Sequence, residues 1–166
     1  MSTKFSLRKA VELAITTEQE GTKFYDTLAE TFSDDAELRD MFSVLARDEE
    51  IHEHQFRALL KDIPADEPRD IPEREQLYIR ALAEAEFFSP LEDAAASARK
   101  ISSRQDGLQR AYSLERKALL FYSGLQEILG PSDVLDAIIA TEKQHLTRVM
   151  KYMLSGAEMR GLLEDY

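Results

Sequence analysis

The chain has 166 residues and a mass of 19.0 kDa, the size of one domain with a core of its own. Its 21 Lys and Arg against 32 Asp and Glu leave a net charge of −11, so the clustered positive charge of a nucleic-acid-binding protein is not expected. The absence of Cys excludes disulfides, thiolate zinc sites, iron–sulfur clusters and a thiol nucleophile. Any metal ion must be held by nitrogen and oxygen, and only three His are available, at positions 52, 54 and 145.

Neither a targeting leader nor a membrane span is predicted. The apolar stretch near the N-terminus is interrupted by Glu12 and followed by Glu18 and Glu20, which would spoil a signal-peptide core. No run of residues approaches the roughly 20 apolar positions that a membrane-spanning helix needs. We therefore expect a cytoplasmic protein with no membrane span.

Glycine and proline are sparse, and the long segments between them repeat apolar residues at steps of three and four, which predicts an all-α fold. Residues 63–72 contain three of the five prolines and are predicted to be a stiff connector. Residues 91–103 fit either a helix or a loop. The predicted helices run over about 6–32, from a cap at Ser33 or Asp34 to about 62, over about 73–88, over about 105–129 with a stop at Gly130 and Pro131, and from Ser132 or Asp133 to Gly156.

Two parts of the sequence repeat. AITTEQEGTKFYDTL at 14–28 matches AYSLERKALLFYSGL at 111–125, and LARDEEIH at 45–52 matches IIATEKQH at 138–145. Chance similarity between amphipathic helices is the alternative, but the polar positions coincide as well as the apolar ones. Two repeated hairpins joined by a long connection predict a four-helix bundle in which the second and third long helices run parallel. We expect a single domain over 1–166, with hairpin 1 at about 6–62, a helical crossover at 63–104, hairpin 2 at about 105–154 and a tail at 155–166.

Charged groups lie inside the apolar stripes of the four long helices. A buried carboxylate is unfavourable unless it is paired, protonated or bound to a metal. On two of the helices a His follows the Glu three residues later, so that both side chains share one face. One Glu from each of two helices and Glu-x-x-His from each of the other two is the ligand set of carboxylate-bridged di-iron and di-manganese bundles. Two carboxylates can bridge the metals while the other groups terminate them. The predicted ligands are Glu18, Glu49, His52, Glu115, Glu142 and His145.

Neighbours of these residues are candidates for supporting roles. Asp48 is expected to orient His145 on the opposite helix, and its counterpart Thr141 to serve His52, because a metal-bound imidazole usually donates its other N–H to a nearby acceptor. Ordinary roles on the helix surface are the alternative for both. His54 follows His52 by two residues, which turns it about 200° round the helix, so we expect it on the solvated surface.

Aromatic pairs recur in both halves of the sequence. Tyr25 and Tyr122 lie seven residues after Glu18 and Glu115, on the predicted metal side and two turns away. Two interpretations of these tyrosines are open. They could hydrogen-bond to the ligand carboxylates or relay electrons, or they could simply pack in the core. The preceding aromatic residues are expected in the core or in an interface; they are Phe24 and Phe121.

At these residues the chain resembles the rubrerythrin branch of the ferritin-like superfamily. The motifs are AI-x-x-E-x-x-G-x-x-FY at 14–25, LA-x-x-E-x-x-H at 45–52 and their second copies. The resemblance covers about residues 7–62 and 106–154. It implies a ferritin-like bundle with a non-haem di-iron centre that reacts with peroxide or dioxygen, in a homodimer or higher homo-oligomer. Carried over position by position, it implies the same six ligands.

Two departures from the family's pattern affect the expected activity. The rubredoxin domain of rubrerythrins delivers electrons through two Cys-x-x-Cys pairs, and this chain has no Cys, so a separate electron donor or Fe(II) itself is implied. Rubrerythrins also carry an extra Glu one turn after the third-helix ligand, where this chain has Ala118. The remaining four Glu and two His are also the set of bacterioferritin-type ferroxidase centres.

We expect an oxidoreductase of the peroxidase or ferroxidase type, in which two iron ions react with hydrogen peroxide or dioxygen. Manganese or zinc fits the same oxygen and nitrogen ligands. The alternative is a ferroxidase or iron-binding module that handles Fe(II), concentrated by the acidic surface. A third possibility is a helical assembly protein whose metals only stabilise the fold. The sequence indicates no catalytic group beyond the ligands.

Overall fold

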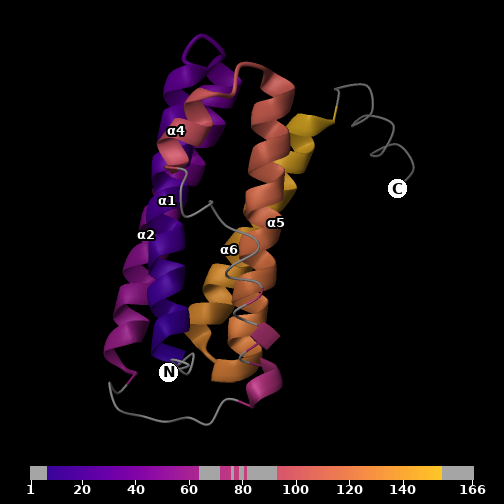
Figure 1. Cartoon of the computed structure of the whole chain (residues 1–166). Helices are drawn as coiled ribbons and strands as arrows, with labels where there is room; N and C mark the ends of the chain where they lie inside the picture. The colour runs from indigo at the N-terminus through magenta and orange to yellow at the C-terminus, as the bar shows by residue number, and fades with distance from the viewer. Residues whose placement is uncertain (1–6, 64–71, 76, 79–80, 82–92, 155–166) are drawn as a thin grey trace, which may run out of the picture.

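The computed structural model describes residues 7–63, 72–75, 77, 78, 81 and 93–154, and every regular element in this part of the chain is a helix (Figure 1). The all-α prediction is confirmed. Four helices are long and one is short: α1 (Leu7–Thr31), α2 (Ala36–Lys61), α4 (Ala94–Arg99), α5 (Arg104–Leu129) and α6 (Asp133–Met153).

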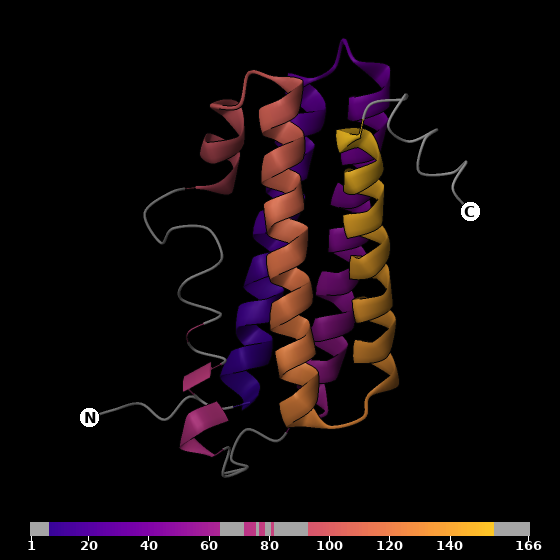
Figure 2. The same cartoon turned by 90° about the vertical axis from the view of Figure 1, so that its right-hand side faces the viewer.

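The long helices form two antiparallel hairpins. One consists of α1 and α2 and the other of α5 and α6, and the hairpins lie against each other as two layers (Figure 2). Between the layers, α1 contacts α5 and α2 contacts α6. The short α4 packs against α1, close to the start of α5, so that α2 and α5 run in the same direction (Figure 1). This is the four-helix bundle with one long crossover that the repeat predicts.

Side chains cap the helix starts. The α2 cap is Asp35, whose carboxylate accepts a hydrogen bond from the Leu38 backbone N–H at 3.1 Å, so the prediction of Ser33 or Asp34 is wrong by one or two residues. For α6 the Ser132 hydroxyl oxygen accepts from the Leu135 N–H at 3.3 Å, as the sequence predicts.

Of the two helix ends predicted at glycines in the second hairpin, one agrees with the structure and one does not. α5 stops at Gly130, whose φ of 80° and ψ of −170° lie in a region that is essentially restricted to glycine. Its N–H donates to the Gln126 carbonyl at 2.9 Å. By contrast, α6 ends at Met153, earlier than the predicted stop at Gly156, because the backbone is already extended at Leu154. Gly156 and the predicted tail lie outside the described residues.

The crossover is the least predictable part. Within the ambiguous stretch 91–103 a short helix forms, capped by Asp93, whose carboxylate accepts from the Ala95 N–H at 2.8 Å. Its Ala94 and Ala98 are buried, so contact with α1 stabilises it. Of the helix predicted at about 73–88, residues 73–75, 77, 78 and 81 are helical, and the rest lies outside the described residues.

Two apolar clusters fill the bundle. One gathers the residues toward the Leu7 end of α1, including Phe121, and the other those toward its Thr31 end, including Phe24. Both phenylalanines are fully buried, in agreement with a core position. On each long helix the predicted ligands lie between the two clusters, so the structure places a polar layer halfway along an apolar core. None of the described helices combines the length and apolar character that a membrane crossing requires.

Replacing Gly130 with alanine should strain the turn between α5 and α6. The Cβ makes the observed backbone angles unfavourable by about 1–3 kcal/mol, so Gly130→Ala should lower the free energy of unfolding by that amount in urea. The control is Glu127→Ala, at an exposed position on the same helix, which should change stability by less than about 0.5 kcal/mol. Equal effects of the two substitutions would contradict a special role for the glycine.

Candidate metal centre

The structure brings all six predicted ligand residues together in the middle of the bundle. Each is at most 6% exposed, although all are polar. Their ligand atoms form two groups, within each of which all atoms lie within 4.8 Å of one another. Two residues, Glu49 and Glu142, belong to both groups. The first group is Glu18, Glu49, His52 and Glu142, and the second is Glu49, Glu115, Glu142 and His145.

In the first group, one imidazole nitrogen faces three carboxylates from three helices. His52 Nδ1 lies 2.9 Å from Glu142 Oε1, 3.6 Å from Glu49 Oε2 and 3.7 Å from Glu18 Oε2. These atoms come from three helices and lie close enough together to be ligands of a single cation.

The second group repeats this arrangement. His145 Nδ1 lies 3.3 Å from Glu115 Oε2, 3.8 Å from Glu142 Oε2 and 3.9 Å from Glu49 Oε1. The His52 and His145 ring centroids are 5.5 Å apart. The two groups are therefore adjacent, with the shared carboxylates between them.

Many of these polar atoms have no hydrogen-bond partner among the described residues. The unsatisfied buried atoms include Nδ1 of both histidines, both oxygens of Glu142 and one oxygen each of Glu18 and Glu115. A buried polar atom left without a partner is unfavourable by about 1–3 kcal/mol, so such a concentration at one point needs an explanation. Carboxylate oxygens and imidazole nitrogens are suitable ligands for divalent iron, manganese and zinc. The donor set and its geometry fit a pair of divalent cations.

Without a cation, the cluster favours bound protons. Burial raises the pKa of Glu18 and Glu49, and it raises that of Glu142 to about 8, where the neighbouring Glu49 carboxylate adds to the effect. Burial alone would lower the pKa of His145, but the adjacent Glu115 carboxylate outweighs it and raises the pKa to about 9. The same balance, with Glu142 as the main partner, raises the pKa of His52. Cations that enter the cluster would displace these protons.

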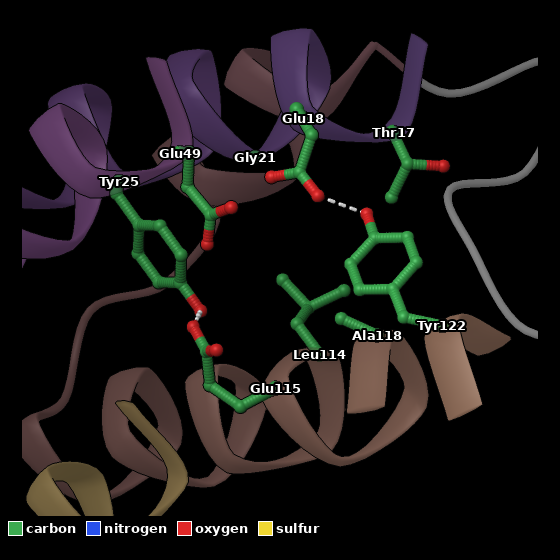
Figure 3. A pocket seen from close by; sticks show the side chains of 9 residues that line it. All are labelled: Thr17, Glu18, Gly21, Tyr25, Glu49, Leu114, Glu115, Ala118 and Tyr122. Carbon is green, nitrogen blue, oxygen red and sulfur yellow. Dashed lines mark hydrogen bonds between the residues drawn. The ribbon is translucent and has the colours of Figure 1, made fainter. Parts of the chain in front are cut away.

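Two tyrosines hold the outer carboxylates. The Tyr25 hydroxyl donates to Glu115 Oε1, and the Tyr122 hydroxyl donates to Glu18 Oε1, so each hydrogen bond joins the two hairpins (Figure 3). Both rings also pack in the core, where they are at most 1% exposed. Hydrogen bonding to the carboxylates and core packing, which the sequence presents as alternatives, are therefore combined in the same side chains.

The supporting residues differ between the two halves. Asp48 Oδ2 lies 3.2 Å from His145 Nε2, which is the contact expected for it. Thr141 makes no hydrogen bond to His52 among the described residues; its hydroxyl donates instead to the Ala137 carbonyl one turn earlier at 3.1 Å. That expectation for Thr141 is therefore wrong. His54 is exposed and lies outside the cluster, as predicted.

A small cavity lies beside the cluster, between α1 and α5 (Figure 3). Its volume of about 20 Å³ holds about one water-sized molecule. Sequence reasoning missed Thr17, Gly21 and Leu114 as lining residues. A signal was available, since Gly21 and Ala118 occupy equivalent positions in the repeat and both are small. The lining consists of Thr17, Glu18, Gly21, Tyr25, Glu49, Leu114, Glu115, Ala118 and Tyr122.

Comparison with known proteins agrees with this geometry. The family model of rubrerythrin matches residues 9–104, more than half of the chain. The chain belongs to the rubrerythrin family. The match covers α1 and α2, with Glu18, Glu49 and His52, while the remaining cluster residues follow it in the chain. For this rubrerythrin-family member, the buried Glu and His cluster fits a di-iron protein.

The fold is also found in a crystal structure from Thermotoga maritima, described as a ferritin-like diiron-carboxylate protein. The two structures align with a TM-score of 0.66 and 24% sequence identity, over 92% of this chain and 97% of the other. The similarity confirms the ferritin-like bundle. No curated protein shows significant sequence similarity to the chain.

Removing either tyrosine hydroxyl should destabilise the metal-free protein. Tyr25→Phe and Tyr122→Phe each leave a buried carboxylate oxygen without its donor, which should lower the free energy of unfolding by about 1–3 kcal/mol in urea. Tyr112→Phe is the control, because its hydroxyl makes no hydrogen bond to another described residue, and it should change stability by less than about 0.5 kcal/mol. If all three substitutions have the same small effect, the cross-hairpin bonds contribute nothing to stability.

Proposed function

We propose that this rubrerythrin-family chain holds two iron ions and acts as an oxidoreductase toward hydrogen peroxide or dioxygen. The observation that carries the proposal is the concentration of buried carboxylate and imidazole atoms without partners in the middle of an apolar core. Manganese and zinc fit the same donor atoms, so the choice of iron rests on the family and on redox chemistry.

The residues have distinct proposed roles. Glu49 and Glu142 would contribute to holding both metal ions, because they belong to both groups of ligand atoms. Glu18 with His52 and Glu115 with His145 would complete the two ends. Four carboxylates match the charge of two divalent cations, so the filled layer carries no net charge and its burial is favourable compared with that of isolated carboxylates.

The chemistry that an iron pair would supply when bound is two-electron reduction of a small oxidant, each Fe(II) giving one electron. The chain's own residues position that oxidant and exclude other molecules. The cavity beside Glu49 has room for about one water-sized molecule, so a small oxidant such as peroxide or dioxygen matches it more closely than an organic substrate does. Tyr25 and Tyr122 hold the outer carboxylates in place through their hydroxyl protons. Buried apolar residues on both sides keep bulk water out.

Repeated turnover needs electrons from elsewhere. The 166 residues of the sequence contain no Cys, so they provide no rubredoxin-type centre, and we propose a separate electron donor. A homodimer or higher homo-oligomer is part of the same proposal and rests on the family resemblance. We also propose a cytoplasmic location.

A ferroxidase or iron-handling role is the second candidate. It is favoured by Ala118, which lines the cavity at the position where the family pattern has an additional Glu. Within the described part of the chain, the two ligand groups include four carboxylates and no fifth. In this role Fe(II) is the substrate, and sustained Fe(II) oxidation without an added donor would favour it over a peroxidase.

Anaerobic Fe(II) titration should show two ions bound per chain, and addition of peroxide should then produce a ligand-to-metal absorption band. His52→Ala should reduce the binding to one ion or fewer, because it removes a donor from the first group. His54→Ala is the matched control and should still bind two, since this His is exposed and outside the cluster.

A stoichiometry near zero, or no absorption band on oxidation, would contradict the proposal. If Glu142→Ala lowers the melting temperature but the wild-type protein has no redox activity, the metals only stabilise the fold.

Filling the cavity should separate metal binding from the reaction with the oxidant. Ala118→Leu places a larger side chain in the cavity, and moving it aside to admit an oxidant would require about 1–3 kcal/mol. The rate of iron oxidation by peroxide, followed by stopped-flow absorbance, should fall roughly ten- to hundredfold. Binding of two Fe(II) should persist. The control, Ala140→Leu, lies at an exposed position on α6 and should leave the rate unchanged. An unchanged rate in Ala118→Leu would show that the oxidant does not use this cavity.

A further inference from the structure

The cluster has an approximate two-fold symmetry that follows from the sequence repeat. Each ligand of one half has a counterpart of the same type in the other half, and the tyrosines exchange hydrogen bonds symmetrically. Asp48 and Thr141 also occupy equivalent positions, immediately before the two Glu that belong to both ligand groups, but one carries a carboxylate and the other a hydroxyl. The pairs that match in chemistry are Glu18 and Glu115, Tyr25 and Tyr122, Glu49 and Glu142, and His52 and His145.

On the Asp48 side the histidine is held by a carboxylate. Asp48 Oδ2 lies 3.2 Å from Nε2 of His145, whose side chain is 1% exposed. An acceptor at this position keeps the ring proton on Nε2 and leaves the Nδ1 lone pair directed at the carboxylates of the second group. The negative charge also increases the basicity of the imidazole as a ligand.

On the Thr141 side this support is missing. The Thr141 hydroxyl uses its proton in a hydrogen bond to the Ala137 carbonyl of its own helix. Among the described residues, no hydrogen bond to His52 Nε2 is found, although His52 Nδ1 faces its own three carboxylates just as His145 Nδ1 does. The two imidazoles therefore face similar sets of carboxylates through Nδ1, but only His145 has a carboxylate partner at Nε2 among the described residues.

We propose that the two metal positions are unequal, and that the position at His145 binds the first metal and retains it longer than the position at His52. Asp48 is the positioning residue that produces the difference. The inference rests on the proposed metal centre. Loss of such a supporting partner typically reduces metal affinity roughly 10- to 100-fold, which sets the expected difference between the two positions.

The test uses Co²⁺ as the probe on the metal-free full chain. Titration against a competing chelator gives two stepwise dissociation constants, and anomalous scattering from crystals with one equivalent of cobalt locates the first ion. We expect the wild-type protein to place that cobalt mainly at the His145 position. Asp48→Asn should weaken the first step roughly 10- to 100-fold and make the two occupancies similar.

The reciprocal variant makes the test symmetrical. Thr141→Asp introduces the missing carboxylate near His52 and should tighten the second step while leaving the first unchanged. Glu50→Gln is the control, because it removes an exposed negative charge next to Glu49 without touching either histidine, and it should leave the occupancy ratio unchanged. Melting temperatures of the metal-free variants check that all of them are folded.

Equal occupancy in the wild-type protein, or a ratio that Asp48→Asn does not alter, would overturn the inference while leaving the metal centre intact. A ratio altered equally by Glu50→Gln would also overturn it, because general charge and not the hydrogen bond would then be responsible. If cobalt binds at neither position, the proposed function itself fails.

Discussion

Four carboxyl groups and two imidazoles lie in the middle of this bundle, where an ordinary core would hold apolar side chains. Their desolvation is unfavourable, and it is tolerable only if protons or cations neutralise the layer. The rest of the fold shields this polar layer from water and holds its groups together. Apolar clusters exclude water on both sides, each long helix contributes at least one group, and two tyrosines satisfy the carboxylate oxygens that face away from the cluster centre. Such a layer makes sense physically as a place for divalent cations.

Repetition of a hairpin explains how such a site is built. Each hairpin provides a Glu from its first helix and a Glu-x-x-His pair from its second, so docking two copies face to face places equal ligand sets on both sides. Gly21 and Ala118 occupy equivalent positions in the repeat and both line the cavity, where the absence of a side chain and a single methyl group leave space. Symmetry thus accounts for both the ligands and the space beside them, while the difference between Asp48 and Thr141 shows where the halves have diverged.

Much of the site could be predicted from the sequence, because helical spacing determines which residues share a face. Glu49 and His52 lie three residues apart in one such pair, and that spacing is independent of how the helices pack. Spacing does not indicate which carboxylates belong to both ligand groups, since this depends on the contacts of α1 with α5 and of α2 with α6.

The helices of the fold are predictable for the same reason, but their exact ends and the short crossover helix are not. Asp35 adjoins two other suitable caps, and α4 depends on contact with α1, which local sequence does not encode. The expectation for Thr141 fails, since among the described residues its hydroxyl bonds to the Ala137 carbonyl of its own helix and not to His52.

The crossing of the tyrosine hydrogen bonds has a consequence for assembly. Tyr25 belongs to the first hairpin and bonds to Glu115 of the second, and Tyr122 does the reverse. Each ligand group likewise draws on both hairpins, so neither hairpin can build half of the centre by itself. The hairpins can form through contacts local in sequence, but the polar layer becomes complete only when they dock. Opening of either hairpin would then disrupt both ligand groups in one event, so retention of either ion would depend on both hairpins staying folded and docked.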